Sequence, residues 1–380
     1  MSLFLFIGLL LSCVIYFRWL RLMPWRLSWK IVAMIIVVMG AFKFHLFWHI
    51  GGGMFFAPLL PRPILILGGF LFCTDIFLTV FVLFADVWNL IIKGLCRLKL
   101  LQCKSHRQLL VRYVCLALAL IVSAVGVHNT LTVPEPHEVT MSFDRWPAEL
   151  NGIRIAVLAD LHADNITNQE KIRQIVNRTN ETKPDLILIV GDFVDGKVSE
   201  QSEALLPLQD LHAKYGVYAV PGNHDYYSGF NEWMPYLKER GIQMLFNQHV
   251  MLFEGQIALG GVTDPAAYRR DMEGPDVAKA FKDTPKDCFR ILMAHQPVLA
   301  DDARQNGVDL QLSGHTHGGM MWGLNQLVAT MNRGLVSGMY DREPLTVYVS
   351  NGTCLWNGFP VRLGVPAELL LITAERRSSK

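Results

Sequence analysis

Seven side chains of the kinds that bind metal ions lie in five short motifs in the second half of this chain. The motifs are AVLADLHAD, VGDFVD, PGNHD, MAHQP and SGHTHGG. Their metal-binding side chains are, in order, Asp160, His162, Asp192, Asn223, His295, His315 and His317. Carboxylate, imidazole and amide ligands without a thiolate favour Mn, Fe, Zn or Ni. They argue against a structural zinc site, which commonly uses cysteine.

A set of this size is too large for one tetrahedral ion, but it suits two ions that share a bridging carboxylate. Two metals about 3.5–4 Å apart are typical of phosphoryl-transfer enzymes, because together they polarise the phosphate and generate a hydroxide. The composition of the set therefore predicts a two-metal centre that hydrolyses a phosphoester.

Each motif follows a short apolar run that ends at Gly or Asp or close to one, as buried strands do. The runs are Ile153–Leu158, Leu186–Val190, Val217–Val220, Ile291–Met293 and Val308–Leu312. Ligands at the carboxyl ends of strands are brought together when the strands join a sheet. Helices are expected between them, at residues 168–181, 199–214, 230–240, 275–282 and 296–306. The alternation predicts an α/β domain, which EVTMSF (138–143) opens as an edge strand.

In type and order the five motifs resemble the calcineurin-like metallophosphoesterase superfamily. GVYAVPGNHDYYSG, VDLQLSGHTHGG and FPVRLGVPAELLLIT resemble its membrane-associated, YkuE-like bacterial subgroup. The resemblance covers roughly residues 138–375 and implies two packed mixed β-sheets flanked by helices. One departure is Met320 after GHTHGG, where many relatives carry Gln; a more apolar rim there would fit a lipid-like substrate.

The resemblance also implies a role for each side chain. It implies that one metal is held by Asp160, His162, Asp192 and His317. It implies that the second is held by Asp192, Asn223, His295 and His315, with Asp192 as the bridge. A hydroxide between the metals would attack phosphorus in line, without a covalent enzyme intermediate. His224 would protonate the leaving alkoxide as general acid, and Asp225 would hold the ring of His224 in place.

Several nearby residues allow a structural interpretation as well as a functional one. Asp195 could simply end its strand, Asp225 could cap the following helix, and Asp264 could shape a turn before Pro265. The loop 351–353 is expected to line the mouth of the cleft.

The first 130 residues carry most of the apolar excess of a chain that is 51% hydrophobic with a mean hydropathy of +0.27. Four segments are long enough to span a bilayer, at residues 2–20, 31–50, 64–91 and 108–127. Buried helices of a soluble domain are excluded because nearly the whole region is apolar. A cleaved signal peptide is not expected, because the first segment lacks a basic start and a small-residue cleavage site.

Basic residues cluster in two of the loops between these spans. The first cluster is Arg18, Arg21, Arg26 and Lys30, and the second is Lys93, Arg97, Lys99, Lys104 and Arg107. The loop between spans two and three has only Arg62. The positive-inside rule then places both clusters in the cytoplasm and the catalytic domain on the extracytoplasmic side of the cell membrane. A miscount of one span would reverse the side of the domain.

Three ionisable residues lie within the predicted spans, where charge is costly and often functional. Lys43 is in the second span, and Asp75 and Asp86 are in the third. Lys43 and Asp86 could reach opposite interfaces. For Asp75, near mid-span, we consider an interhelical pair with Lys43 as a hypothesis.

These observations predict a transmembrane domain of about four helices at 1–130, a linker at 131–151, a metallophosphoesterase domain at 152–375 and a tail at 376–380. Pro134, Pro136 and Pro147 prevent a continuous helix through the linker. A net charge of +2, with basic residues in the loops, indicates contact with anionic lipid rather than nucleic acid. No protein partner is indicated.

The predicted function is that of a membrane-bound phosphoesterase with two divalent metals, Mn foremost. The expected substrate is a phosphodiester or a lipid-linked phosphate at the membrane surface. Two alternatives stay open: a phosphomonoesterase or nucleotide hydrolase of the same fold, and a membrane sensor or carrier whose domain only binds.

Overall fold

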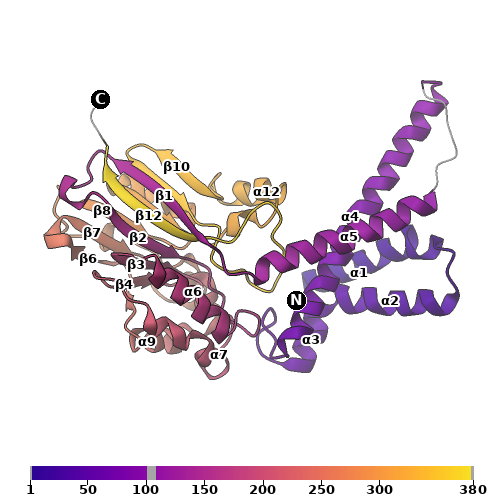
Figure 1. The fold of residues 1–380 in the computed structure, drawn as a ribbon, viewed down its shortest axis with the longest axis horizontal. Coiled ribbons are helices and arrows are strands. Elements are labelled where there is room, and N and C mark those ends of the chain that lie inside the picture. The colour runs from indigo at the N-terminus through magenta and orange to yellow at the C-terminus, as the bar shows by residue number, and fades with distance from the viewer. Residues whose placement is uncertain (1, 101–107, 378–380) are drawn as a thin grey trace. The chain divides into compact units, whose positions relative to one another are not determined.

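A computed structural model describes residues 2–100 and 108–377, and it divides into two compact units (Figure 1). The helical unit comprises Met1–His128 with Asn357–Val361. The sheet unit comprises Asn129–Trp356 with Arg362–Lys380. Lys104 and Arg107 of the second basic cluster lie outside the described residues.

The helical unit consists of apolar helices: α1 (Ser2–Arg18), α2 (Leu27–Ala41), α3 (Lys43–Gly51), α4 (Arg62–Arg97) and α5 (Gln108–Leu131). Among the described residues three helical segments are long and apolar enough to cross a membrane: Ser2–Leu22, α4 and α5. The number rises to four if α2 and α3, which are bent by 74° at Phe42, form one span.

The bend changes the second predicted span, which was expected as one helix over residues 31–50. The 15 residues of α2 rise about 22 Å at roughly 1.5 Å per residue, which is less than the bilayer core of about 30 Å. α2 therefore needs α3 to complete a crossing. Hydropathy could not reveal this, because the residues on both sides of Phe42 are predominantly apolar.

The ionisable residues of the helical unit have identifiable surroundings. Buried Lys43 donates to the backbone carbonyl of Asn357 at 3.1 Å, and its Nζ lies 4.5 Å from the ring centroid of Phe44. Asp86 accepts a hydrogen bond from Nε of Arg18 in α1 at 2.7 Å. Asp75 is buried against Gly40 of α2. Asp86 is therefore an ion-pair partner, while a pair between Lys43 and Asp75 stays a hypothesis.

The sheet unit contains two mixed six-stranded sheets. The first sheet has the order β1 (Pro136–Phe143), β12 (Leu369–Arg376), β2 (Ile153–Leu158), β3 (Leu186–Val190), β4 (Val217–Val220) and β5 (Gln243–Met244). The second has the order β10 (Gly338–Arg342), β11 (Leu345–Val349), β9 (Leu310–Ser313), β8 (Phe289–Met293), β7 (Ile257–Gly261) and β6 (Gln248–Leu252). β2, β3 and β4 have the predicted bounds, and β1 is the predicted edge strand.

The helices of this unit are α6 (Gln169–Glu181), α7 (Val198–Leu205), α8 (Asn223–Ser228), α9 (Phe230–Lys238), α10 (Val277–Ala280), α11 (Ala300–Gln305) and α12 (Leu324–Met331). One core lies between the sheets, where Val157 and Leu188 of the first sheet pack in the same cluster as Leu259 and Ile291 of the second. α6, α7 and α9 cover the outer face of the first sheet (Figure 1). Residues of α10 and α11 pack on that of the second sheet. This arrangement is the predicted α/β fold.

Some boundaries differ from the sequence-based expectation for local reasons. The helix expected over 199–214 ends at Leu205 and continues as a 3-10 turn that contains Pro207. The ordered sheet begins with β1 inside the predicted linker, and β12 runs through Arg376 into the predicted tail. α8 and α12 were not expected at all.

The strand order decides where the motifs meet. β2, β3 and β4 are parallel neighbours in the first sheet, and β8 and β9 are parallel neighbours in the second. Parallel neighbours end at the same edge of a sheet, so the loops that follow these five strands gather at one end of the sandwich.

Candidate metal centre

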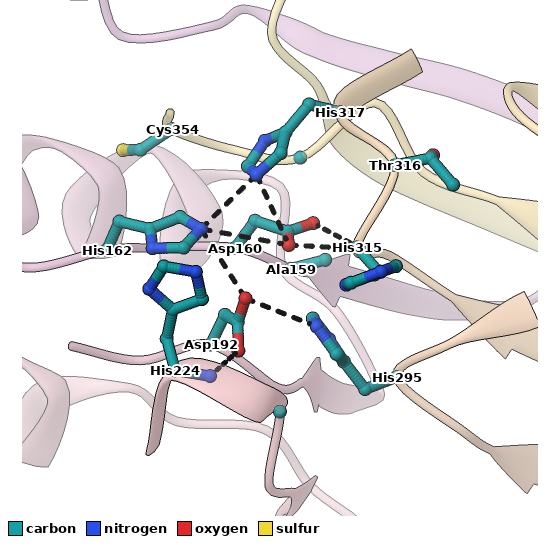
Figure 2. Close-up of polar contacts among 12 residues, drawn as sticks. Ala159, Asp160, His162, Asp192, His224, His295, His315, Thr316, His317 and Cys354 are labelled. Atoms are coloured by element: carbon teal, nitrogen blue, oxygen red, sulfur yellow. Dashed lines mark hydrogen bonds and ion pairs between the residues drawn. The ribbon is translucent and has the colours of Figure 1, made fainter. Parts of the chain in front are cut away.

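The predicted ligands come from these five loops. Six of them, all except Asn223, lie around one small volume (Figure 2). The loop after β2 supplies Asp160 and His162, and the loop after β3 supplies Asp192. Asn223 is the first residue of α8, directly after β4. The loops after β8 and β9 supply His295, His315 and His317.

Asp160, His162 and His317 form one group of possible ligands, whose nearest ligand atoms all lie within 4.8 Å of one another. Nε2 of His162 is 3.3 Å from Nε2 of His317 and 3.9 Å from Oδ1 of Asp160. All three side chains are buried. Two imidazole nitrogens and a carboxylate directed at one point are a suitable donor set for a divalent transition metal.

Asp192, His295 and His315 form a second group within the same distance limit. Oδ2 of Asp192 lies 3.2 Å from Nε2 of His295 and 3.6 Å from Nε2 of His162 in the first group. One carboxylate oxygen thus faces both groups, which is the position of a bridging ligand. The predicted division into two sets of ligands around Asp192 matches this geometry and remains a prediction until metal binding is measured.

The donor set fits a metal in two further respects. Oδ1 of Asn223 is buried and has no hydrogen-bond partner among the described residues, which is unusual for a buried amide unless a ligand satisfies it. His295 places Nδ1 2.8 Å from the carbonyl of Val190. Because a carbonyl only accepts, Nδ1 carries the proton and Nε2 is left with a lone pair for a metal.

Burial also keeps one ligand in its metal-binding form. Removal from water, together with the nearby His295, lowers the pKa of His315 to about 3. His315 is therefore neutral at physiological pH, and neutral imidazole is the form that binds metals.

His224, the predicted general acid, lies beside the two groups with its ring held by Asp195. Nδ1 of His224 is 2.5 Å from Oδ1 of Asp195, and the other oxygen of Asp195 is 3.1 Å from Nδ1 of His162. Burial opposes a charge on His224, but Asp195 and Asp192 outweigh it and raise the pKa of His224 to about 9. Asp195 therefore orients both the candidate acid and a candidate metal ligand.

Asp225 does not have the position expected for it. Its carboxylate accepts hydrogen bonds from the backbone amides of Gly222, Asp192 and Phe193. The expectation that Asp225 holds the ring of His224 is corrected: Asp195 takes that place. Asp225 instead joins the loop after β3 to the start of α8. It lies within α8 and does not cap the following helix α9, whose N-cap is Gly229.

The backbone at the centre is unusual. Five of the seven predicted ligands have a positive φ: Asp160, His162, Asp192, His315 and His317. This conformation is uncommon for residues other than glycine, and it clusters at functional sites. Close packing at the centre also requires glycine at position 222, because a Cβ there would lie 2.2 Å from Oδ1 of Asp192.

The remaining candidates support the loops. Asp264 accepts from the amide of Ala266 at 2.8 Å, which is the predicted turn, and also from Nε2 of Gln296 at 3.0 Å. In the loop 351–353, Oγ1 of Thr353 accepts from the amide of Ala159 at 3.3 Å. A Cβ on Gly352 would lie 3.0 Å from Nδ1 of His317, so this loop packs against the first ligand group.

Arg362 was not anticipated as part of the site. It is almost fully buried, and its guanidinium donates to the carbonyls of Asn351, Gly352 and Cys354 at 2.7–3.1 Å. It therefore fixes the loop that contacts His317. In the sequence, the feature that could have pointed to Arg362 is that it is a single arginine in the apolar run FPVRLGVP.

Replacing Asp195 with asparagine should lower turnover by about 10- to 100-fold, the usual cost of losing a carboxylate that orients a metal-bound histidine. The amide keeps the shape but removes the charge that faces His162 and His224. Steady-state kinetics with metal content measured in parallel checks this. Arg145 in the same unit pairs with Asp309, and Asp309→Asn is the control that should leave the metal centre intact. Equal losses in the two variants would contradict the role of Asp195.

Comparison with known proteins agrees with this geometry. The calcineurin-like phosphoesterase family matches residues 153–319. A transmembrane protein with metallophosphoesterase domain from Danio rerio is 36% identical over 274 residues, covering 68% of this chain and 62% of that protein. An uncharacterized metallophosphoesterase of Helicobacter pylori is 35% identical, covering 64% of this chain and 65% of that protein. The uncharacterized metallophosphoesterase YkuE of Bacillus subtilis is 29% identical, covering 66% of this chain and 91% of that protein.

Residues 153–319 therefore form a calcineurin-like phosphoesterase domain, and the similarity to YkuE supports the predicted subgroup. Calcineurin-like phosphoesterases are metal-dependent enzymes that use a two-metal centre. The match spans less than two thirds of the relatives from Danio rerio and Helicobacter pylori.

Proposed function

We propose that this protein is a membrane-bound two-metal phosphoesterase that hydrolyses a phosphodiester or a lipid-linked phosphate. The observation that carries the proposal is the position of Asp192, whose Oδ2 faces Nε2 of both His162 and His295 at 3.6 and 3.2 Å. One metal would be held by Asp160, His162, Asp192 and His317. The other would be held by Asp192, Asn223, His295 and His315. Bound metals would polarise the phosphoryl group and supply a nucleophile at neutral pH.

His224 would act on the leaving group. Its Nδ1 is occupied by Asp195, so Nε2 is the atom that can donate a proton to the departing oxygen. Asp195 keeps the imidazole protonated and oriented, in addition to holding the ring of His162. The residues of this proton-transfer step come from the loops after β2, β3 and β4.

The membrane helices support a substrate that stays at the bilayer. α5 ends at Leu131 and β1 begins at Pro136, so four residues connect an apolar helix to the sheet unit. Four or five extended residues reach roughly 14–18 Å. A domain on so short a connection stays near the surface, where phospholipids and lipid-linked phosphates have their phosphoester groups.

The side of the membrane follows from the basic residues. We propose that α2 and α3 together form one bent span, which puts both basic clusters in the cytoplasm and the sheet unit outside. If α2 and α3 instead formed a re-entrant loop, one of the two clusters would face outward. The positive-inside rule disfavours that arrangement, so a multi-pass protein of the cell membrane with an extracytoplasmic domain is the better interpretation.

Detergent-purified full-length protein stripped of metal should regain hydrolysis of a chromogenic phosphodiester when Mn²⁺ is added, with two ions bound per chain. Hydrolysis of the matching monoester under the same conditions separates the proposed function from the alternative of a phosphomonoesterase or nucleotide hydrolase. Metal binding without turnover of either compound would contradict the enzymatic proposal and favour a sensor or carrier.

A further inference from the structure

Residues 320–336 form an excursion that we call the flap, which contains α12 and directly follows the last predicted metal ligands (Figure 1). Both ends of the flap are bonded to the turn that carries those ligands. The amide of Met320 donates to the carbonyl of His317 at 3.0 Å, and Oγ1 of Thr316 donates to the carbonyl of Val336 at 2.7 Å. The flap is therefore a part of the sheet unit whose base is at the metal centre.

The flap exposes large hydrophobic side chains. Among the described residues of the sheet unit, seven such side chains are exposed: Tyr227, Met251, Tyr268, Trp322, Leu327, Met331 and Met339. Three of the seven lie in the flap, with exposures of 76% for Trp322, 58% for Leu327 and 75% for Met331. Leu327 and Met331 are four residues apart and so share one face of α12.

None of the eight residues of α12 is buried. A helix of this length is not stable in water by itself, and helices of globular proteins are stabilised mainly by packing of an apolar face. In α12, Leu324 and Val328 are only partly covered, and Leu327 and Met331 are left exposed within the described part of the sheet unit. We therefore expect the exposed apolar face of α12 to be buried against another apolar surface, which would stabilise the helix.

Charge decides which partner fits. Between residues 318 and 340 there is no acidic residue, and Arg333 is the one charged residue, although 18% of the whole chain is charged. Arg333 is itself paired with Asp301 of α11 at 2.8 Å. A segment without acidic groups meets no repulsion from anionic lipid headgroups, and exposed Trp is typical of the interface between headgroups and hydrocarbon.

We propose that the flap inserts Trp322, Leu327 and Met331 into the surface of the bilayer to which the chain is anchored. Interfacial helices bind in this way, with the apolar face at the boundary between headgroups and acyl chains. The short connection between α5 and β1 keeps the sheet unit beside that surface. As a consequence, which rests on the proposed function, a lipid phosphoester could reach the metal centre without leaving the membrane.

The test uses the full-length chain with a photoreactive benzoylphenylalanine in place of Leu327, reconstituted in phospholipid vesicles. Irradiation should add the mass of one phospholipid to the chain. Lys282, which is exposed on the same unit, is replaced in the control and should give no lipid adduct. A second probe at Met331 should behave like the probe at Leu327, and an unchanged metal content shows that each chain is folded.

Absence of a lipid adduct at both flap positions, or adducts only between protein chains, would overturn the proposal. The second result would identify another copy of the chain as the partner of α12. The readout is independent of turnover, so a failure here leaves the phosphoesterase function untouched, and an inactive but lipid-linked protein would overturn only that function.

Discussion

Replacement of Asp192 with asparagine is expected to reduce hydrolysis of every phosphoester substrate by about 10³-fold or more. Bound metals contribute several kcal/mol of transition-state stabilisation, and each 1.36 kcal/mol corresponds to a factor of about ten in rate. Oδ2 of Asp192 faces both ligand groups, so a neutral amide should weaken both ions at once. The same amide can keep the contact with the backbone amide of His224, which Oδ1 of Asp192 now accepts at 2.8 Å.

Thermal unfolding separates this effect from a loss of structure. A ligand that binds only the folded state raises its stability, so Mn²⁺ should raise the Tm of the native protein far more than that of the Asp192→Asn variant. The metal-free proteins should unfold at similar temperatures. Asp283→Asn makes the same chemical change at an exposed position and should keep both the activity and the Mn²⁺ effect. Full metal content in the Asp192 variant would contradict the bridging role.

The fold was largely predictable because its strands are short apolar runs with clear ends. Leu186–Val190 is flanked by Asp185 and Gly191, and Val217–Val220 by Gly216 and Pro221, so the observed bounds of β3 and β4 follow from the sequence. The ligands directly after these runs were placed at the correct sheet edge for the same reason. Burial of a whole strand leaves little freedom in its register.

The partner of His224 could not be predicted in the same way. Asp195 and Asp225 both lie close in sequence to candidate ligands, and distance along the chain favours Asp225. In the structure Asp195 lies beside His224, because the chain after β3 pairs with the chain after β2 through Ala163 and Val194. Such a contact between two loops has no apolar periodicity, so only the folded backbone reveals it. The positive φ angles of the ligands are hidden for the same reason.

In the helical unit and the flap the apolar pattern is clear in the sequence, but it does not predict what the apolar residues pack against. The segment 31–50 satisfies the requirement for a span, yet the chain bends by 74° at Phe42. In the flap, Leu327 and Met331 would normally indicate a buried helix face, and they are exposed. Hydropathy measures the preference for an apolar environment, whether lipid or protein core provides it.

His224→Gln is expected to slow hydrolysis of an alkyl phosphodiester by about 10²–10⁴-fold, the usual contribution of a general acid. The loss should be much smaller for a nitrophenyl ester, because nitrophenolate is a stable anion that departs with little help from a proton. Metal content should be unchanged, since Nδ1 of His224 is held by Asp195 and its other ring nitrogen is needed for no predicted metal. Rates for a series of esters that differ only in the leaving group measure this dependence.

The slope of that series distinguishes a proton donor from a residue that merely shapes the pocket. An acid compensates for a poor leaving group, so the native protein should show a shallow dependence of rate on leaving-group acidity and the variant a steep one. His212 is exposed outside the candidate centre, and His212→Gln should leave the slope unchanged. A uniform loss across the series in the His224 variant would assign that side chain to binding of the phosphate instead, with Asp195 still serving to hold the ring of His162.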